Sequence, residues 1–173
     1  MNKKYELTDE TKEIWGITLH RIRALMDIPR YDVKSGDLGG WIEAESNLSQ
    51  DDDAWVSDDA RVYGKAMVCG DARVYGDAVV RGDARVYGNA RVSGDARVSG
   101  DGDVMWFKNT WSSGRWFTYT RSNKKWAVGC FYGTGEELIK KAYADSEKSG
   151  KCYEAIVRAV ETIETAQGET KGE

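Results

Sequence analysis

A repeat of six residues is the feature that most constrains how this chain of 173 residues folds. From Val56 to Asp103 the sequence reads VSDDAR, VYGKAM, VCGDAR, VYGDAV, VRGDAR, VYGNAR, VSGDAR and VSGDGD. Valine opens every unit, and alanine takes the fifth place in all units but the last. A period of six does not match the 3.6-residue turn of an α-helix, and each glycine at the third place would cost a helix about 1 kcal/mol. The repeat is therefore extended rather than helical.

Each unit predicts one short strand followed by a corner. Valine and alanine lie four places apart, so both side chains point to the same face of an extended segment. Gly-Asp or Gly-Asn at the third and fourth places tolerates the backbone of a sharp turn. Three consecutive units then close one triangular coil. Successive coils stack at the spacing of paired strands, about 4.8 Å.

The pattern of an aliphatic residue, three variable places and a small residue resembles the hexapeptide repeat of left-handed β-helices. The resemblance implies a mainly β protein with a short left-handed parallel β-helix of about three coils over residues 56–103. Because open coil ends expose unpaired strands, we expect a cap on each side. Residues 1–55 predict a β cap, with a hairpin that turns at Gly16 and an irregular first coil plugged by Trp41, Leu48 and Trp55.

Residues 104–165 predict a small, aromatic-rich α+β domain as the second cap. The segments RWFTYTR and KKWAVGCFYG suggest two strands of a hairpin. One helix is expected from Thr134 or Gly135 to about Asp145, and a second from Tyr153 to about Thr165. Residues 166–173 are expected to form a disordered tail.

Outward side chains of the coils form a first set of candidate binding residues. Stacking of every third unit predicts that Arg61, Val79 and Arg97 form one column and that Arg81 lies between Tyr63 and Ser99. Two interpretations stay open: solvated residues neutralised by neighbouring aspartates, or a surface that recognises a partner or an anionic ligand. The candidates on this surface are Arg73, Tyr75, Arg81, Arg85, Tyr87 and Arg91.

Aromatic and basic residues alternate after the repeat and give a second set of candidates. They either fill the core of the cap or form a shelf on which a base or ring stacks beside cationic side chains. The candidates on this shelf are Trp111, Arg115, Trp116, Tyr119, Arg121 and Trp126.

The chemistry available to the chain argues for binding rather than catalysis. Many hexapeptide-repeat proteins resembling this one are acyltransferases that use a histidine as general base between subunits of a trimer. Here the single histidine, His20, precedes the repeat, and few other side chains titrate near neutrality. The zinc site of solenoid carbonic anhydrases needs three histidines, and Cys69, Cys130 and Cys152 lie far apart. We therefore predict a protein that is not an enzyme and that has no metal site or cofactor.

Composition and charge restrict where the protein is expected to act and what it is expected to bind. No apolar run approaches the roughly 20 residues of a membrane span. A net charge of −4 argues against general affinity for nucleic acids. The odd number of cysteines and the start MNKKYELTDE, which has no apolar signal segment, predict a cytoplasmic protein.

Three segments carry a resemblance that covers most of the chain: YELTDETKE with LHRIRAL, GDLGGWIE leading into AWVSDDARVYG, and WAVGCFYGTGEEL. The chain resembles small hexapeptide-repeat proteins encoded by phages and prophages. That resemblance implies an accessory protein of the anti-defence or anti-CRISPR class in the host cytoplasm, which sequesters a cyclic or other signalling nucleotide or blocks a host defence protein. A diverged acyltransferase and a structural virion or assembly component are the alternatives. Solenoids of this type commonly associate side to side, so we expect a homo-oligomer, with a trimer favoured.

Overall fold

The computed structural model describes residues 3–169, which divide into two compact units. The first unit holds the described residues up to Trp106 together with Thr118–Asn123. The second holds Phe107–Phe117 and the described residues from Lys124 onward. The repeat lies within the first unit.

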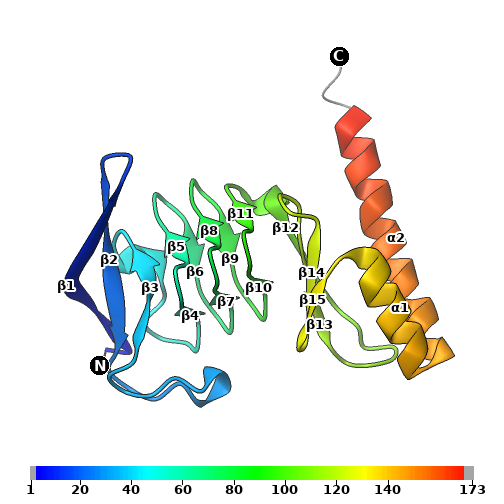
Figure 1. Ribbon diagram of the computed structural model, residues 1–173, viewed down its shortest axis with the longest axis horizontal. Coiled ribbons are helices and arrows are strands. Elements are labelled where there is room, and N and C mark those ends of the chain that lie inside the picture. The colour runs from blue at the N-terminus through cyan, green and yellow to red at the C-terminus, as the bar shows by residue number, and fades with distance from the viewer. Residues whose placement is uncertain (1–2, 170–173) are drawn as a thin grey trace. The chain divides into compact units, whose positions relative to one another are not determined.

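The repeat forms the predicted parallel β-solenoid, whose coils stack in Figure 1. Each strand before the last coil pairs in parallel with the strand of the third unit after it, so that Arg61 lies opposite Val79 and Val79 opposite Arg97. Three walls result, made by β4–β7–β10, β5–β8–β11 and β6–β9. The strands are two residues long and end on the valine of each unit: β4 (Trp55–Val56), β5 (Arg61–Val62), β6 (Met67–Val68), β7 (Arg73–Val74), β8 (Val79–Val80), β9 (Arg85–Val86), β10 (Arg91–Val92) and β11 (Arg97–Val98).

The core of the solenoid consists of the repeated valines and alanines. From Val56 to Val98, every valine that opens a unit and every alanine at the fifth place has at most 1% of its surface exposed. Each side chain therefore packs against its counterparts in neighbouring coils. This arrangement confirms the prediction that the first and fifth places point inward.

The corners depend on left-handed backbone at the third place. From Gly64 to Gly94 the glycine φ angles there run from 62° at Gly88 to 73° at Gly76, and Asp58 takes the same conformation with a φ of 58°. Gly100 in the last unit is the exception, with an extended φ of −153°. The Asp58 carboxylate also accepts a hydrogen bond of 3.0 Å from the Gly76 N–H one coil further on. An acidic third-place residue thus links two coils as well as making the turn.

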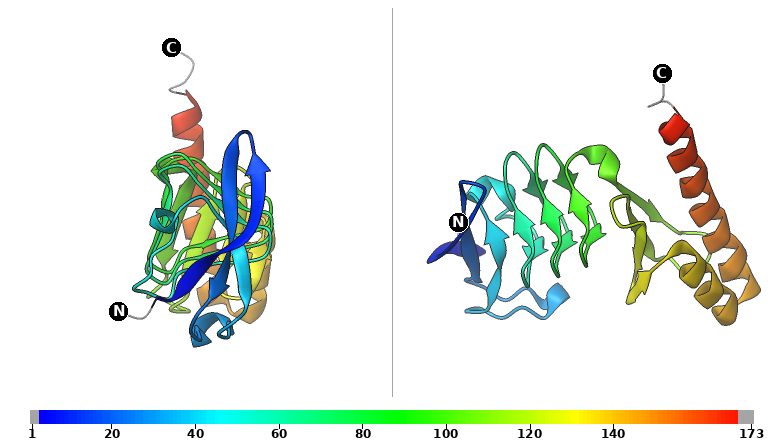
Figure 2. Two further views of the ribbon diagram at one scale, coloured as in Figure 1. Left: turned by 90° about the vertical axis from the view of Figure 1, so that its left-hand side faces the viewer. Right: turned by 45° about the horizontal axis from the view of Figure 1, so that its top comes forward.

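The N-terminal cap continues one wall of the solenoid. The predicted hairpin is present as β1 (Tyr5–Ile14) and β2 (Ile17–Ala24), and β2 pairs antiparallel with β3 (Leu38–Ile42). Because β3 pairs in parallel with β5, the hairpin joins a six-stranded sheet in the order β1-β2-β3-β5-β8-β11 (Figures 1 and 2). This edge of the solenoid is therefore covered by paired strands.

The first coil is irregular because it is longer than three units. Ile42 lies opposite Val62 and Leu48 opposite Val68, and both separations exceed by two positions the regular separation between Val56 and Val74. Leu48 and Trp55 are each 1% exposed within the solenoid core, as predicted. The prediction is wrong for Trp41, which packs outside the coil against Leu19 and Tyr63, because Ile42 occupies the inward register.

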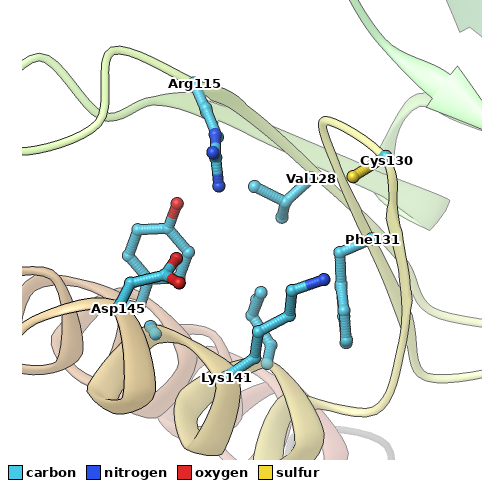
Figure 3. A pocket seen from close by; sticks show the side chains of 9 residues that line it. Arg115, Val128, Cys130, Phe131, Lys141 and Asp145 are labelled. Carbon is cyan, nitrogen blue, oxygen red and sulfur yellow. The ribbon is translucent and has the colours of Figure 1, made fainter.

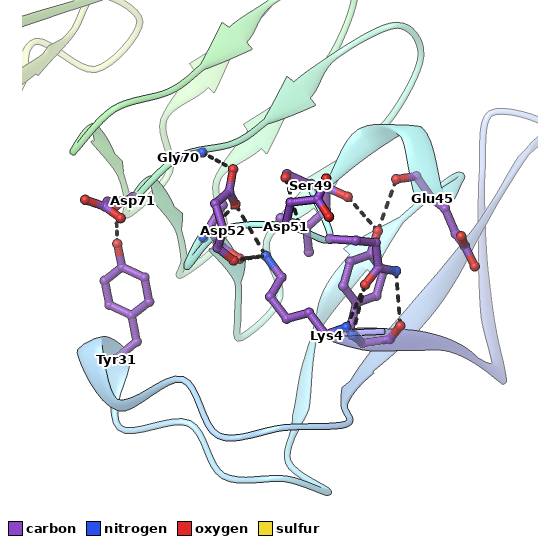
Figure 4. A network of polar contacts seen from close by, with 12 residues as sticks. Lys4, Tyr31, Glu45, Ser49, Asp51, Asp52, Gly70 and Asp71 are labelled. Atoms are coloured by element: carbon purple, nitrogen blue, oxygen red, sulfur yellow. Dashed lines mark hydrogen bonds and ion pairs between the residues drawn. The ribbon is translucent and has the colours of Figure 1, made fainter. Parts of the chain in front are cut away.

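Two residues of the N-terminal segment close the irregular coil (Figure 4). The Lys4 ammonium donates to the Asp52 and Ala54 carbonyls at 2.8 and 2.7 Å, and only 3% of this side chain is exposed. Burial lowers the pKa of Lys4, although the nearby Asp52 carboxylate opposes that shift. The buried Tyr5 hydroxyl donates to the Leu48 carbonyl at 2.7 Å, and burial raises the pKa of Tyr5.

Tyr5→Phe is expected to lower the free energy of unfolding by about 1 kcal/mol at neutral pH, because the Leu48 carbonyl loses its donor. The raised pKa makes this contribution pH-dependent: the neutral phenol is favoured in the fold, so the stabilisation is complete below the ordinary pKa of about 10 and declines above it. Urea unfolding of both proteins at about pH 8 and about pH 11 measures the difference. A constant difference between the two pH values would contradict the assignment.

Side chains of the first unit also cover the last coil. The Arg91 N–H donates to the Thr118 hydroxyl at 3.0 Å, and the Arg97 N–H donates to the Ser122 hydroxyl at 2.7 Å. The Arg121 N–H in turn donates to the Asp103 carbonyl at 2.9 Å. Hydroxyl groups thus satisfy backbone donors that a following coil would otherwise pair.

After the repeat lie a four-stranded sheet and two helices. The strands β12 (Val104–Lys108), β13 (Trp116–Thr120), β14 (Lys125–Val128) and β15 (Phe131–Gly133) neighbour one another in that order. Helix α1 (Gly135–Asp145) has the predicted bounds, and Thr134 and Glu137 form a capping box at its start. The next helix, α2 (Glu147–Glu169), begins well before the predicted Tyr153.

Helix α2 also continues past its predicted end at Thr165. Residues 166–169 form its last described turn, so they are not the disordered tail that the sequence predicted. Residues 170–173 of that predicted tail lie outside the described residues. Within residues 3–169, neither helix combines the length and the apolar composition that crossing a membrane requires.

Candidate functional site

A groove of about 390 Å³ lies on the wall formed by β5, β8 and β11. Its floor is explained by one irregular unit of the repeat, VYGDAV, which ends in valine where neighbouring units on this wall end in arginine. The short side chain of Val79 therefore leaves a hollow between Arg61 and Arg97 in the same column. The lining residues are Trp15, Arg61, Tyr63, Asp77, Val79, Arg81, Asp95 and Arg97.

The arginines of this groove form no ion pair within the described part of the chain, although Asp77 and Asp95 line the same groove. Within residues 3–169, Arg61, Arg81 and Arg97 form no ion pair, and the Arg61 Nε is buried without a hydrogen-bond acceptor. By contrast, Arg23 and Arg30 outside the groove form ion pairs with Glu6 and Asp71. Three guanidinium groups are thus available to an anion, which they bind with strong, directional hydrogen bonds.

An exposed indole stands at the edge of the groove. Trp15 and Gly16 form the two-residue turn of the β1–β2 hairpin, and both have positive φ, at 50° and 80°. This type I′ geometry favours asparagine or glycine, and a bulky residue there costs about 1 kcal/mol. Trp15 is nevertheless 80% exposed, so its ring contributes little to the core. A strained, exposed aromatic residue beside a cationic groove is typical of a binding role.

The six residues predicted on the coils do not form one surface. Arg81 lies in the groove, whereas Arg73, Tyr75 and Arg91 belong to the β4–β7–β10 wall. There the Arg73 guanidinium lies 5.3 Å from the Tyr31 ring centroid and 5.0 Å from that of Tyr75.

Tyr31 lies in the segment before β3. Its position is fixed because the Tyr31 hydroxyl donates a hydrogen bond to the Asp71 carbonyl (Figure 4). Arg73 therefore has a structural role that the sequence did not reveal. Arg85 and Tyr87 belong to the third wall, where the Tyr87 ring meets Trp106 edge-on at 4.6 Å.

The predicted aromatic shelf is only partly present. The prediction is wrong for Trp126 and Tyr119, which are 2% and 5% exposed and cannot present a ring to a ligand. Trp126 is buried because it packs within the sheet and meets Phe117 edge-on, with 6.4 Å between centroids. The Trp116 ring lies 5.5 Å from the Lys108 ammonium, and the Arg121 backbone is held by Asp103.

Two of the predicted shelf residues lie at cavities of the second unit. Trp111 is 68% exposed and lines an apolar groove of about 510 Å³ with Phe107, Lys108, Cys152, Ala155, Ile156 and Ala159. Arg115 lines a smaller pocket between the sheet and the helices (Figure 3). These two sites are separate, so the shelf is not one surface.

Of the residues that line the solenoid groove, only Arg81 was among the predicted binding residues. The seven others are Trp15, Arg61, Tyr63, Asp77, Val79, Asp95 and Arg97. Stacking of every third unit places Arg61 and Arg97 on either side of Val79, so the short side chain of Val79 is the sequence signal for a hollow at this point. The Trp-Gly pair between Ile14 and Ile17 was the signal for Trp15.

The single histidine lies in the N-terminal cap, away from the coils of the repeat. His20 is on β2 opposite Ile42, and its Nδ1 lies 3.4 Å from the Thr8 carbonyl. It is not among the residues that line the groove. The lining offers three guanidinium groups that suit an anion, and a phenol and an indole that suit an aromatic ring. The carboxylates of Asp77 and Asp95 also line the groove and oppose anion binding.

Comparison with known proteins agrees with the architecture. No curated protein matches the chain. Residues 66–82 and 84–100 match the family model described as YdcK beta solenoid repeat. The matched segments are consecutive and contain β6 to β11, the strands that form the middle and last coils. Over these residues the chain is similar to the YdcK repeat, and it is a β-solenoid repeat protein.

Proposed function

We propose that the protein is a non-enzymatic binding protein that sequesters a signalling nucleotide in the arginine groove of the solenoid. The observation that carries the proposal is the gathering of Arg61, Arg81 and Arg97, without ion-pair partners among the described residues, around one hollow on a rigid wall. Phosphate oxygens accept paired hydrogen bonds from guanidinium groups, and a base stacks on an indole ring such as Trp15. A volume of about 390 Å³ lies in the range of small-molecule sites.

The biological context and the oligomeric state of the protein are part of the same proposal. The resemblance to phage and prophage proteins supports an accessory inhibitor of host defence that acts in the host cytoplasm, built on a left-handed hexapeptide-repeat solenoid. We also propose a homotrimer, because solenoids of this type associate through their walls. Sedimentation at 19.3 kDa would contradict the oligomer without affecting the groove.

The apolar groove beside Trp111 favours a second candidate function, the blocking of a host defence protein. Trp111 is 68% exposed, and Ala155, Ile156 and Ala159 continue the apolar surface along α2. Exposed aromatic residues over such a patch are typical of protein interfaces. Native mass spectrometry after incubation with host extract separates the two: a retained small molecule supports sequestration, and a retained protein supports blocking.

Neutralising single arginines of the groove is expected to weaken nucleotide binding without unfolding the protein. With cyclic di-AMP as the probe, Arg61→Gln and Arg97→Gln should each weaken affinity by about tenfold or more, as expected for lost hydrogen bonds to a charged ligand. Titration calorimetry measures the affinity. Arg23→Gln is the matched control, because Arg23 is exposed and already paired with Glu6, so affinity should not change. Equal losses in Arg23→Gln and Arg61→Gln would contradict a specific groove.

Trp15→Asn is a second variant for that experiment, and it is expected to increase stability while it weakens nucleotide binding. Asparagine suits the type I′ turn, so the free energy of unfolding should rise by about 0.5–1 kcal/mol. Loss of the indole should weaken nucleotide binding by about tenfold. A variant that becomes more stable and keeps full affinity would remove Trp15 from the site.

A further inference from the structure

The pocket at Arg115 gathers complementary charges that do not neutralise one another (Figure 3). Arg115 precedes β13, whereas Lys141 and Asp145 lie on α1, one helical turn apart. Within residues 3–169 none of these three side chains forms an ion pair, although all line the same small space. In Figure 3 the Arg115 and Asp145 side chains reach into the pocket from different elements, and Lys141 points toward Phe131.

The remaining lining fixes the shape of this pocket. Val128, Leu138 and Ala142 are at most 2% exposed and give it an apolar floor. The buried Tyr153 hydroxyl donates to the Ser113 hydroxyl at 3.0 Å, so its oxygen remains able to accept a hydrogen bond. The Lys141 ammonium lies 5.8 Å from the Phe131 ring centroid.

Size and charge together select a class of ligand. The volume of about 130 Å³ equals that of about four water molecules in the liquid, which is too small for a nucleotide. Two cationic side chains and one carboxylate complement a ligand with two carboxylates and one ammonium group. Asp145 is also the last residue of α1, where the helix dipole favours a cation.

We propose that this pocket binds an acidic α-amino acid. Arg115 holds one carboxylate through paired hydrogen bonds, and Lys141 faces the other. Asp145 and the Tyr153 oxygen accept from the α-ammonium group, while the methylene carbons pack on Val128 and Leu138. The inference is independent of nucleotide binding, because no residue of this pocket belongs to the solenoid groove.

Titration of the full chain with L-glutamate and L-aspartate, followed by NMR or calorimetry, tests the proposal. Glutarate, which lacks the ammonium group, and L-glutamine, which lacks the second carboxylate, should each bind about tenfold more weakly than L-glutamate. Asp145→Asn should weaken L-glutamate binding by about tenfold without weakening glutarate binding, because glutarate has no ammonium group and is repelled by the Asp145 carboxylate. Arg115→Gln should weaken the binding of both ligands. Lys140→Gln is the control, because Lys140 is exposed and adjacent to Lys141 but does not line the pocket.

Three outcomes would overturn the proposal. The first is no binding of L-glutamate or L-aspartate at about 10 mM, a concentration at which even weak specific sites fill. The second is glutarate or inorganic phosphate binding to the unmodified protein as tightly as L-glutamate. The third is the same L-glutamate affinity in the Asp145→Asn, Arg115→Gln and Lys140→Gln proteins. The comparison of ligands needs no variant, so misfolding of a variant would not prevent the test.

Discussion

Gly82→Ala is expected to lower the free energy of unfolding by about 3 kcal/mol or more, whereas Gly88→Ala should lower it by about 1 kcal/mol. The two glycines have nearly equal φ angles, 65° and 62°, so both variants bear the same cost of a side chain in left-handed backbone. They differ in what a Cβ would meet. At Gly82 it would lie 2.4 Å from the Ser99 carbonyl oxygen of the next coil, and at Gly88 it meets nothing within 4 Å.

The difference in unfolding free energy between these two variants measures the cost of placing a methyl group between closely stacked coils. Denaturant unfolding of both proteins beside the unmodified chain measures it, and relief of the clash would force two backbone segments apart in a paired wall. Equal destabilisation of the two variants would show that the corners tolerate a methyl group between coils. In that case the glycines would serve the turn alone.

Lys4→Met is expected to lower the free energy of unfolding by about 3 kcal/mol. The loss comes from the Asp52 and Ala54 carbonyls, which lose their donor, and from the Asp52 carboxylate, which loses a cation at 3.6 Å. Burial lowers the pKa of Lys4 and so offsets part of what its charge contributes. These groups lie in the irregular part of the first coil, where the repeat cannot supply replacement partners.

Lys3→Met is the matched control for this prediction. Lys3 forms an ion pair with Glu45, but 57% of its side chain is exposed, so its removal should change stability by less than about 0.5 kcal/mol. Because the pKa of Lys4 is lowered in the fold, the unmodified protein should also gain stability as the pH rises toward 10.5, and Lys4→Met should lack that gain. Similar losses from both substitutions would contradict a special role for Lys4.

The solenoid could be predicted from the sequence because its geometry is local. The six residues of each unit are enough to predict one strand and one corner. The stacking of every third unit then places each outward side chain in a column. The first coil escapes this rule, since its extra length before Val56 changes the count and the inward position passes to Ile42 instead of Trp41. Lys4 and Tyr5, which hold that coil, are distant from it in sequence.

The candidate sites were less predictable because they depend on contacts between distant segments. Nothing near Arg73 in the sequence indicates that Tyr31 covers it. Trp126 stands in an aromatic and basic segment that suits a surface shelf, yet it and the two residues after it are buried. Charge and aromatic content alone do not distinguish these residues from Arg81, which does line a groove.

Because the N-terminal hairpin belongs to the same sheet as the β5–β8–β11 wall, the length of the groove depends on the number of strands in that sheet. Trp15 lies in the hairpin at one end of this sheet, and Arg97 lies on β11 at the other end. The distance between them is therefore set by the number of strands that separate them. Inserting or removing one coil of three units would change that span in a single step of about 4.8 Å while leaving each remaining coil intact. On the nucleotide-binding function proposed above, derivatives with more or fewer coils would therefore suit longer or shorter anionic ligands.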